Sequence, residues 1–280
     1  MLIFRILLLC AALCAFASLL FNALAYGFKW WTHVPSCEDD EPLSVAEAVR
    51  AFVGEAFTLL LLLLSWPLGL AGQRDLVCAG SPGNAIVLIH GWGLNAASLW
   101  LLRRRLIRRG YGPVWIFAYK TWRVNVERAA EQLRDALAVN QRTHPVRVTL
   151  IGHSLGGLVA RYCLRRYPPH GVRRLITLGT PHQGTIAARF GPHTRALQPD
   201  SPLMKRLNAA DHVPDQFDVI AIASAADALI VPSANAEYRG AFNISIRGIG
   251  HNALLFSSRV FALIEENVRA QGASTERTDR

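Results

Sequence analysis

The sequence lacks the residue patterns that build metal sites. Its five cysteines include no CxxC pair and no cysteine–histidine cluster with the spacing of metal ligands. Glycine (21 residues), proline (14 residues) and charged residues (18%) are at ordinary levels, and the chain has no internal repeat. These absences argue against fibrous, collagen-like and disordered chains, and against a cysteine-based zinc module.

Acidic residues are scarce, with 20 against 30 basic ones, and the formal net charge is +10. Much of the excess lies on one predicted amphipathic helix, in Arg103, Arg104, Arg105, Arg108 and Arg109. A solvated helix face explains such a run, and attraction to an anionic membrane surface is the alternative. Because no aromatic cluster or reading motif accompanies the charge, we expect no nucleic-acid partner.

Two long apolar segments precede the rest of the chain, at about 6–28 and 51–71. The first is long enough to cross a bilayer, although Ala23-Leu24-Ala25 also resembles a signal-peptidase site. The second contains Glu55, and an acidic side chain costs about 2.5–3.5 kcal/mol in mid-membrane. A run of leucines as dense as 59–64 is nevertheless hard to place on the surface of a soluble protein. Residues 1–75 are therefore predicted to form a membrane-associated region.

Two arrangements of this region remain open. In the first, both segments cross an inner membrane as a hairpin, the acidic stretch 38–41 lies outside, and the basic domain that follows is cytoplasmic. In the second, the first segment is a signal peptide or anchor of a periplasmic protein, and the second lies on the membrane or packs on the domain. Cys37 and Cys78 separate the two, since only the periplasmic arrangement permits a disulfide between them.

From residue 84 to about 270, strand-like runs alternate with amphipathic helical stretches, which indicates a mostly parallel α/β sheet flanked by helices. The predicted strands are 85–89, 113–119, 146–151, 175–178, 219–224 and 244–246. The predicted helices are 95–109, 124–140, 156–167 and 253–269. The polar residues 271–280 are predicted to be a disordered tail.

The segment Gly152-His153-Ser154-Leu155-Gly156 carries the strongest chemical signal. It follows an apolar strand and opens a helix, the context in which a G-x-S-x-G pattern holds a nucleophile on a sharp turn. Glycines at 152 and 156 remove Cβ atoms that would clash across that turn. The helix N-terminus offers free N–H groups to a developing oxyanion. Ser154 is therefore predicted to be a nucleophile.

Backbone N–H groups for an oxyanion hole are expected from Trp92, in the loop after strand 85–89, and from Leu155. His90, in the same loop, precedes the serine in the chain and is interpreted as a structural histidine. The segment 185–213 is interpreted either as a small lid or acyl-pocket wall or as ordinary packing.

For the base and the acid of a triad, His251 and Asp227 are the best candidates. Each follows a strand-like run, which places it at the carboxyl edge of the sheet, and the order Ser, acid, His suits this fold. His182 comes too early in the chain. Asp218 begins its strand at the wrong end of the sheet, and Asp211 and Asp215 are weaker candidates in a loop.

These motifs, together with Leu178-Gly179-Thr180-Pro181-His182-Gln183-Gly184-Thr185 and Leu197-Gln198-Pro199-Asp200-Ser201-Pro202-Leu203, resemble bacterial lipases and esterases of the α/β-hydrolase superfamily. The resemblance runs from about residue 85 to the terminal helix. It implies cleavage of carboxylic esters, often of lipids, through an acyl-enzyme that needs no metal or cofactor. The acid loop, Asp227-Ala228-Leu229-Ile230-Val231-Pro232, departs from the commoner Asp-Gly-x-Val-Pro form.

We therefore expect a serine esterase or lipase with the triad Ser154, Asp227 and His251, acting on lipid-like esters near a membrane. An acyltransferase using the same triad is one alternative. A catalytically inactive membrane-bound scaffold of the same fold is another, and labelling by a fluorophosphonate probe would separate it from an enzyme.

Overall fold

The computed structural model describes residues 1–32, 42–70, 84–143, 147–169, 171–209, 213 and 216–273. Its centre is a sheet of six strands in the order β2-β1-β3-β4-β5-β6, in which each neighbouring pair is parallel. The strands are β1 (Asn84–Ile89), β2 (Val114–Phe117), β3 (Arg147–His153), β4 (Val172–Leu178), β5 (Asp218–Ser224) and β6 (Phe242–Ile246). The predicted parallel α/β sheet is confirmed.

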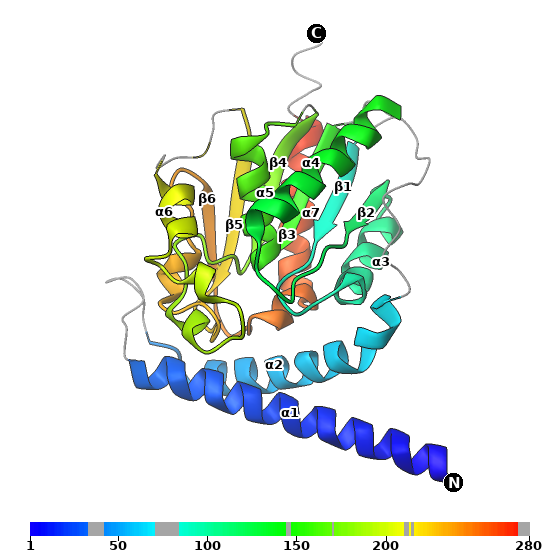
Figure 1. The fold of residues 1–280 in the computed structure, drawn as a ribbon, viewed down its shortest axis with the longest axis vertical. Coiled ribbons are helices and arrows are strands. Elements are labelled where there is room, and N and C mark those ends of the chain that lie inside the picture. Colours follow the sequence, from blue (N-terminus) through cyan, green and yellow to red (C-terminus); the bar gives the residue numbers. More distant parts are fainter. Residues whose placement is uncertain are drawn as a thin grey trace.

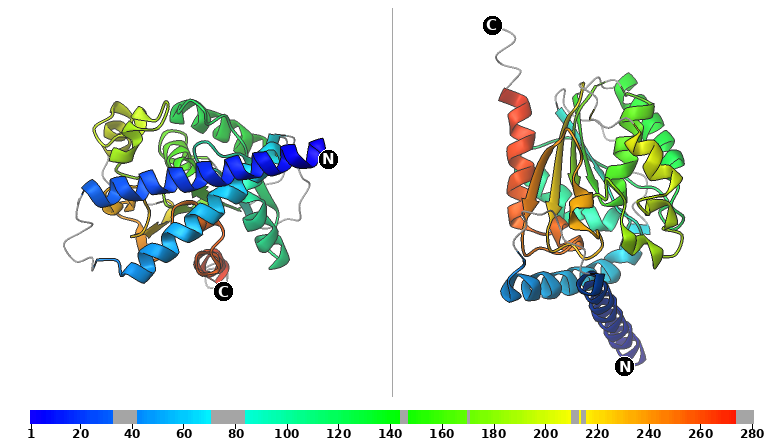
Figure 2. Two further views of the ribbon diagram at one scale, coloured as in Figure 1. Left: turned by 90° about the horizontal axis from the view of Figure 1, so that it is seen from below. Right: turned by 90° about the vertical axis from the view of Figure 1, so that its left-hand side faces the viewer.

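Helices cover both faces of this sheet (Figure 1, Figure 2). α3 (Trp100–Arg108) and α7 (Ser258–Ala273) lie on one face, and α4 (Val126–Thr143), α5 (Leu155–Arg166) and α6 (Pro202–Asn208) lie on the other. Along β1, Ala85, Val87 and Ile89 belong to the α4–α5 core, whereas Ile86 and Leu88 belong to the α3–α7 core. Alternate side chains of a strand point to opposite faces, so a strand buried on both faces is apolar throughout.

Short 3-10 helices connect these elements: η1 (Trp66–Leu70), η2 (Ala96–Leu99), η3 (Ile186–Arg189), η4 (Arg195–Leu197), η5 (Ser233–Ala236) and η6 (Asn252–Leu255). The end of the chain differs from the prediction. The terminal helix begins at Ser258, after η6, and continues to Ala273, so residues 271–273 are helical and not part of a tail. The remaining predicted tail, 274–280, lies outside the described residues.

The two apolar segments form the long helices α1 (Leu2–Thr32) and α2 (Val45–Ser65). α2 runs across the carboxyl ends of the strands, and α1 crosses α2, with its N-terminal end pointing away from the domain (Figure 1, Figure 2). A capping box at Ser44 and Glu47 begins α2. The Ser18 hydroxyl donates a hydrogen bond to the Ala56 carbonyl at 2.6 Å and joins the two helices.

Both segments are long and apolar enough to cross a membrane, over Phe4–Thr32 (29 residues) and Val45–Leu70 (26 residues). In the most apolar 18-residue stretch of each segment, 6% of the residues of the first segment are buried within the protein, against 28% of those of the second. A transmembrane hairpin would surround α2 with lipid, whereas here α2 packs on the domain at the carboxyl edge of the sheet. This placement corresponds to the alternative in which the second segment packs on the domain. Cys37, Cys78 and the acidic stretch 38–41 lie outside the described residues.

Candidate active site

Ser154 occupies a sharp turn between β3 and α5. Its φ angle is +53°, a left-handed conformation that is strained for a residue with a side chain. Hydrogen bonds hold the backbone there, because the Ser154 N–H donates to the Leu178 carbonyl at 2.9 Å and the Thr180 hydroxyl donates to the Ser154 carbonyl at 3.0 Å. This strained strand-to-helix turn is the geometry that exposes a nucleophile at the top of a parallel sheet.

The turn closes because Gly152 and Gly156 have no side chain. A Cβ atom on Gly152 would lie 2.6 Å from the Gly157 Cα, and one on Gly156 would lie 2.4 Å from the Ile89 carbonyl oxygen. Both distances are far below an ordinary contact, so no side chain fits at either position. The two glycines thus let α5 start directly above the end of β1, beside the loop that follows it.

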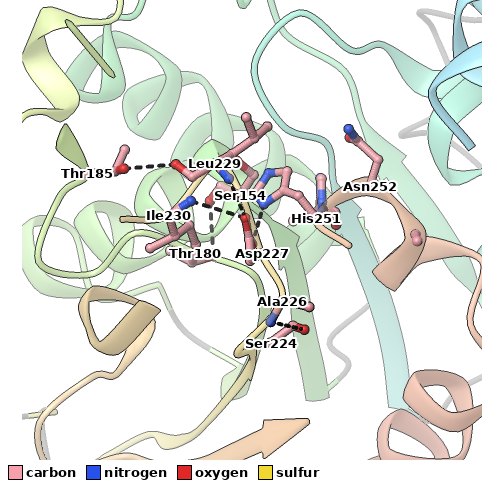
Figure 3. A network of polar contacts seen from close by, with 12 residues as sticks. Ser154, Thr180, Thr185, Ser224, Ala226, Asp227, Leu229, Ile230, His251 and Asn252 are labelled. Atoms are coloured by element: carbon pink, nitrogen blue, oxygen red, sulfur yellow. Dashed lines mark hydrogen bonds and ion pairs between the residues drawn. The ribbon is translucent and has the colours of Figure 1, made fainter. Parts of the chain in front are cut away.

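His251 and Asp227 form a buried hydrogen-bonded pair at the same edge of the sheet. Asp227 follows β5 and His251 immediately precedes η6, and 2.6 Å separates His251 Nδ1 from Asp227 Oδ2. The other carboxylate oxygen of Asp227 accepts N–H bonds from Leu229 at 2.8 Å and Ile230 at 3.1 Å (Figure 3). His251 is 4% exposed and Asp227 is 1% exposed, so little water competes for their contact.

The pair favours an imidazolium facing a carboxylate. Burial alone would lower the pKa of His251, but the charge of Asp227, its hydrogen bond and the charge of Glu55 together hold that pKa above its usual value. Burial likewise acts to raise the pKa of Asp227, and the charge and hydrogen bond of His251, with Lys29, outweigh it and lower that pKa. A histidine in this setting takes up a proton readily and remains oriented by its partner.

The serine turn and the acid–base pair lie against one another. A Cβ atom on Gly179 would lie 3.2 Å from Asp227 Oδ2 and 3.3 Å from His251 Nδ1, while the next residue, Thr180, bonds to Ser154. His153 Nε2 lies 3.1 Å from the carbonyl oxygen of His251. Figure 3 shows Ser154, Asp227 and His251 converging from three separate segments of the chain. The three residues predicted from sequence are therefore brought together.

The predicted oxyanion donors adjoin Ser154. A Cβ atom on Gly91 would lie 3.0 Å from the Ser154 Cβ, so the loop that carries Trp92 packs against the serine. Leu155 is the first residue of α5, and the N–H groups of a first helical turn have no partner within the helix. Both N–H groups therefore belong to the neighbourhood in which an oxyanion would form.

The rival candidates occupy structural positions. The buried ring of His90 stacks on Tyr119 at 4.7 Å between centroids, and burial lowers its pKa to about 4. The buried ring of His182 lies 3.0 Å from the Thr177 hydroxyl and stacks on Tyr238. Asp218 pairs with Arg174 at 2.7 Å, at the start of β5 and away from the catalytic edge. Asp211 and Asp215 lie outside the described residues.

Thr185, the first residue of the candidate lid segment 185–213, supports the acid loop. The Thr185 hydroxyl donates to the Leu229 carbonyl at 2.8 Å and accepts the N–H of Val231 at 3.0 Å. Leu203, Met204 and Leu207 are buried in the α4–α5 core, which is ordinary packing. Phe190, in contrast, is 71% exposed and contacts Phe28 of α1 edge to face.

Two residues of the N-terminal helices reach the site and were not predicted. Lys29 Nζ donates to the carbonyl oxygens of Ala225 at 2.5 Å and Asp227 at 2.7 Å. Glu55 accepts hydrogen bonds from Asn252 and Ala253, the residues after His251. The available signal was the charge itself, because an ionisable residue within an apolar run marks a functional position. Among the described residues, no group of three or more His, Cys, Asp and Glu side chains could hold a metal ion.

Solved structures share this fold. The lipase BlEst2 of Bacillus licheniformis in its mature form matches with a TM-score of 0.58 at 18% identity, over 68% of this chain and 95% of that one. Lipase B of Aspergillus fumigatus matches with a TM-score of 0.59 at 16% identity, over 65% of this chain and 51% of that one. The sheet order, the strained serine turn and these likenesses define an α/β-hydrolase.

The model of the palmitoyl protein thioesterase family matches residues 86–237, more than half of the chain, so the protein belongs to that family. The match includes Ser154 and Asp227 and ends before His251. A lysosomal thioesterase PPT2 homolog of Drosophila melanogaster is 28% identical over 114 residues, which are 38% of each chain. A pimeloyl-[acyl-carrier protein] methyl ester esterase of Photobacterium profundum is 32% identical over 104 residues, 35% of this chain and 37% of that one.

The aligned part thus spans under two fifths of the length of either curated relative. The family and both curated relatives are named for hydrolysis of ester or thioester bonds.

Proposed function

We propose that the protein is a serine hydrolase that cleaves acyl esters and thioesters at a membrane surface through an acyl-enzyme on Ser154. The observation that carries the proposal is the 2.6 Å hydrogen bond between His251 and Asp227, at the same sheet edge as the strained turn of Ser154. A nucleophile, an oriented base and a buried acid are the groups that acyl transfer to a serine uses.

In the proposed reaction, Ser154 Oγ attacks the acyl carbonyl while His251 Nε2 accepts its proton. Asp227 holds Nδ1 and stabilises the imidazolium, and the N–H groups of Trp92 and Leu155 stabilise the oxyanion. His251 then gives the proton to the departing alcohol or thiol, which leaves Ser154 acylated. Water, deprotonated by His251, attacks the acyl group, and collapse of that intermediate releases the carboxylic acid and the free serine.

The membrane part of the proposal rests on α1 and α2. Large apolar side chains are exposed along both helices: Phe4, Leu7, Leu9, Phe16, Leu24, Trp30, Trp31, Val49, Val53 and Phe57. So many exposed apolar side chains on two helices favour a lipid bilayer as their partner, and the two helices lie just beyond the catalytic edge. The relatives named as a thioesterase and a methyl ester esterase favour acyl groups carried on sulfur or oxygen.

Ser154→Ala tests the proposed function. Hydrolysis of p-nitrophenyl butyrate and of palmitoyl-coenzyme A, the latter measured by thiol release, should fall to assay background, because loss of a serine nucleophile costs about 10⁶-fold in kcat. A fluorophosphonate probe should label the wild type and not the variant, while both give the same melting curve. Retained hydrolysis by folded Ser154→Ala would refute the assignment.

A further inference from the structure

Glu55 is a buried carboxylate in the middle of the apolar helix α2. It is 2% exposed, although leucine and other apolar residues surround it in the sequence. Burying an unpaired charge in such a position would cost much free energy of folding, so a buried carboxylate needs hydrogen-bonding partners. The partners of Glu55 belong to the segment that carries His251. The first of them, Asn252, is 197 residues later in the chain than Glu55.

Both oxygens of Glu55 accept hydrogen bonds from this segment. Oε1 accepts from the Asn252 N–H at 2.9 Å and from Asn252 Nδ2 at 2.7 Å, and Oε2 accepts from the Ala253 N–H at 2.9 Å. Three donors on two oxygens favour the ionised carboxylate, because charge-assisted hydrogen bonds are the stronger ones. Burial outweighs the charge of His251 and the hydrogen bonds from Asn252 and Ala253, which act to lower the pKa of Glu55, and leaves this pKa above its usual value.

The contact extends to both sides of the catalytic histidine. A Cβ atom on Gly250, which precedes His251, would lie 2.5 Å from Glu55 Oε2 and 2.7 Å from the Glu55 Cβ. The side chain therefore packs against residue 250 and bonds to residues 252 and 253. Such a clamp limits the backbone positions open to His251, which already bonds to Asp227 through Nδ1.

The charge of Glu55 also acts on the imidazole. The titratable groups near His251 are Asp227, Glu55 and the neutral ring of His153, whose centroid lies 4.9 Å from that of His251. The uncharged hydroxyl of Tyr26 also lies beside this segment, 3.0 Å from where a Cβ atom on Gly250 would be. Burial lowers the pKa of His153 to about 3, so it adds no positive charge. Lys29 lies further back, on the carbonyl of Asp227. Two carboxylates therefore support the imidazolium that forms when Ser154 loses its proton.

We propose that Glu55 is a positioning residue for His251: its carboxylate, carried on α2, clamps the turn around the histidine and stabilises the imidazolium beside Asp227. This inference rests on the proposed role of His251 as the base. If Glu55 positions His251, α2 takes part in the reaction. This helix is then needed for hydrolysis as well as for the proposed attachment to a membrane.

Glu55→Gln and Glu55→Asp test the inference in the full-length protein, with thiol release from palmitoyl-coenzyme A followed as a function of pH. Glutamine removes the charge and places an NH₂ group against an N–H donor, so kcat should fall about 10- to 100-fold. Loss of a negative charge near His251 should also shift the acid limb of kcat/KM to lower pH, by about one unit. Aspartate keeps the charge, so its acid limb should stay at the wild-type pH although kcat falls.

Glu47→Gln is the matched control. Glu47 is also on α2 and binds Arg247 through Nε at 2.8 Å and through Nη2 at 3.0 Å, which ties the helix to the end of β6 without touching His251. This variant should weaken the packing of α2 and leave the acid limb in place. A shift in Glu47→Gln equal to that in Glu55→Gln would assign the effect to loosened packing and overturn the inference.

The outcomes separate this inference from the proposed function. If wild type hydrolyses the substrate and Glu55→Gln keeps both its kcat and its acid limb, Glu55 has no positioning role, although the serine mechanism stands. If wild type itself fails to hydrolyse or to react with the probe, the proposed function fails first. Should Glu55→Gln unfold, Glu55→Asp decides alone: wild-type kcat in that variant overturns the inference, and reduced kcat with an unmoved acid limb supports it.

Discussion

Replacing Gly156 by alanine tests the close packing on which the serine turn depends. The added Cβ would lie 2.4 Å from the Ile89 carbonyl oxygen and 2.7 Å from that of His90, whereas ordinary contacts begin near 3.4 Å. Both neighbours are backbone atoms and cannot rotate away. The start of α5 must therefore move away from the end of β1 by about 1 Å, the difference between 3.4 Å and 2.4 Å.

That displacement separates Ser154 and the Leu155 N–H from the loop that carries Trp92. A misplacement of about 1 Å costs about 10²-fold in rate, and we expect a loss of that size in kcat/KM for p-nitrophenyl butyrate. Overpacking of this kind also costs about 1–3 kcal/mol in the free energy of unfolding, which corresponds to a melting temperature lower by several degrees.

Gly54→Ala serves as the control, because a Cβ atom there would have nothing within 4 Å and Gly54 lies within α2. Alanine in a helix is favoured over glycine by about 1 kcal/mol, so this variant should be as stable as wild type or more so, with unchanged activity. If Gly156→Ala retained at least half of the wild-type kcat/KM at an unchanged melting temperature, the contact would not limit the geometry of the site and the reasoning would fail.

Two further predictions concern charge at the site. Because the pKa of His251 is raised, its neutral, proton-accepting form predominates only at a pH above the usual pKa of 6.5. The acid limb of kcat/KM for p-nitrophenyl butyrate should therefore have its midpoint above pH 6.5, and a midpoint at or below that value would contradict this balance of charges. Lys29→Met keeps the apolar stem of the side chain and removes a cation that lowers the pKa of Asp227. This variant should have a lower melting temperature in thermal unfolding. The acid limb of its kcat/KM profile should lie at higher pH than in wild type, opposite to the shift in Glu55→Gln. An acid limb that stays in place would show that Lys29 only supports the fold.

The core of the hydrolase domain could be predicted because its signals are local. A strand buried on both faces must be apolar throughout, as 85–89 is, and a nucleophile turn requires small residues at fixed spacing around Ser154. The acid and the base needed a further rule. Chain order and the ends of parallel strands led to Asp227 and His251, which the structure places 2.6 Å apart.

The ends of elements were less predictable. The last helix begins at Ser258 where residue 253 was expected, because η6 occupies Asn252–Leu255. Hydrophobic spacing alone does not separate two such short helical stretches, and the N–H groups of the first turn of η6 donate hydrogen bonds to Glu55. That partner lies 197 residues away and leaves no trace in the local pattern.

The sequence alone was enough to predict the α/β sheet, the serine turn and the two apolar segments at 6–28 and 51–71. The positions of the two apolar helices could be known from the folded structure alone. An apolar segment is expected to be shielded from water, but its sequence does not indicate whether lipid or protein covers it. α2 packs on the catalytic edge, where Glu55 finds its donors and Lys29 of α1 reaches Asp227, because folding supplies polar partners that no neighbouring residue in the sequence provides.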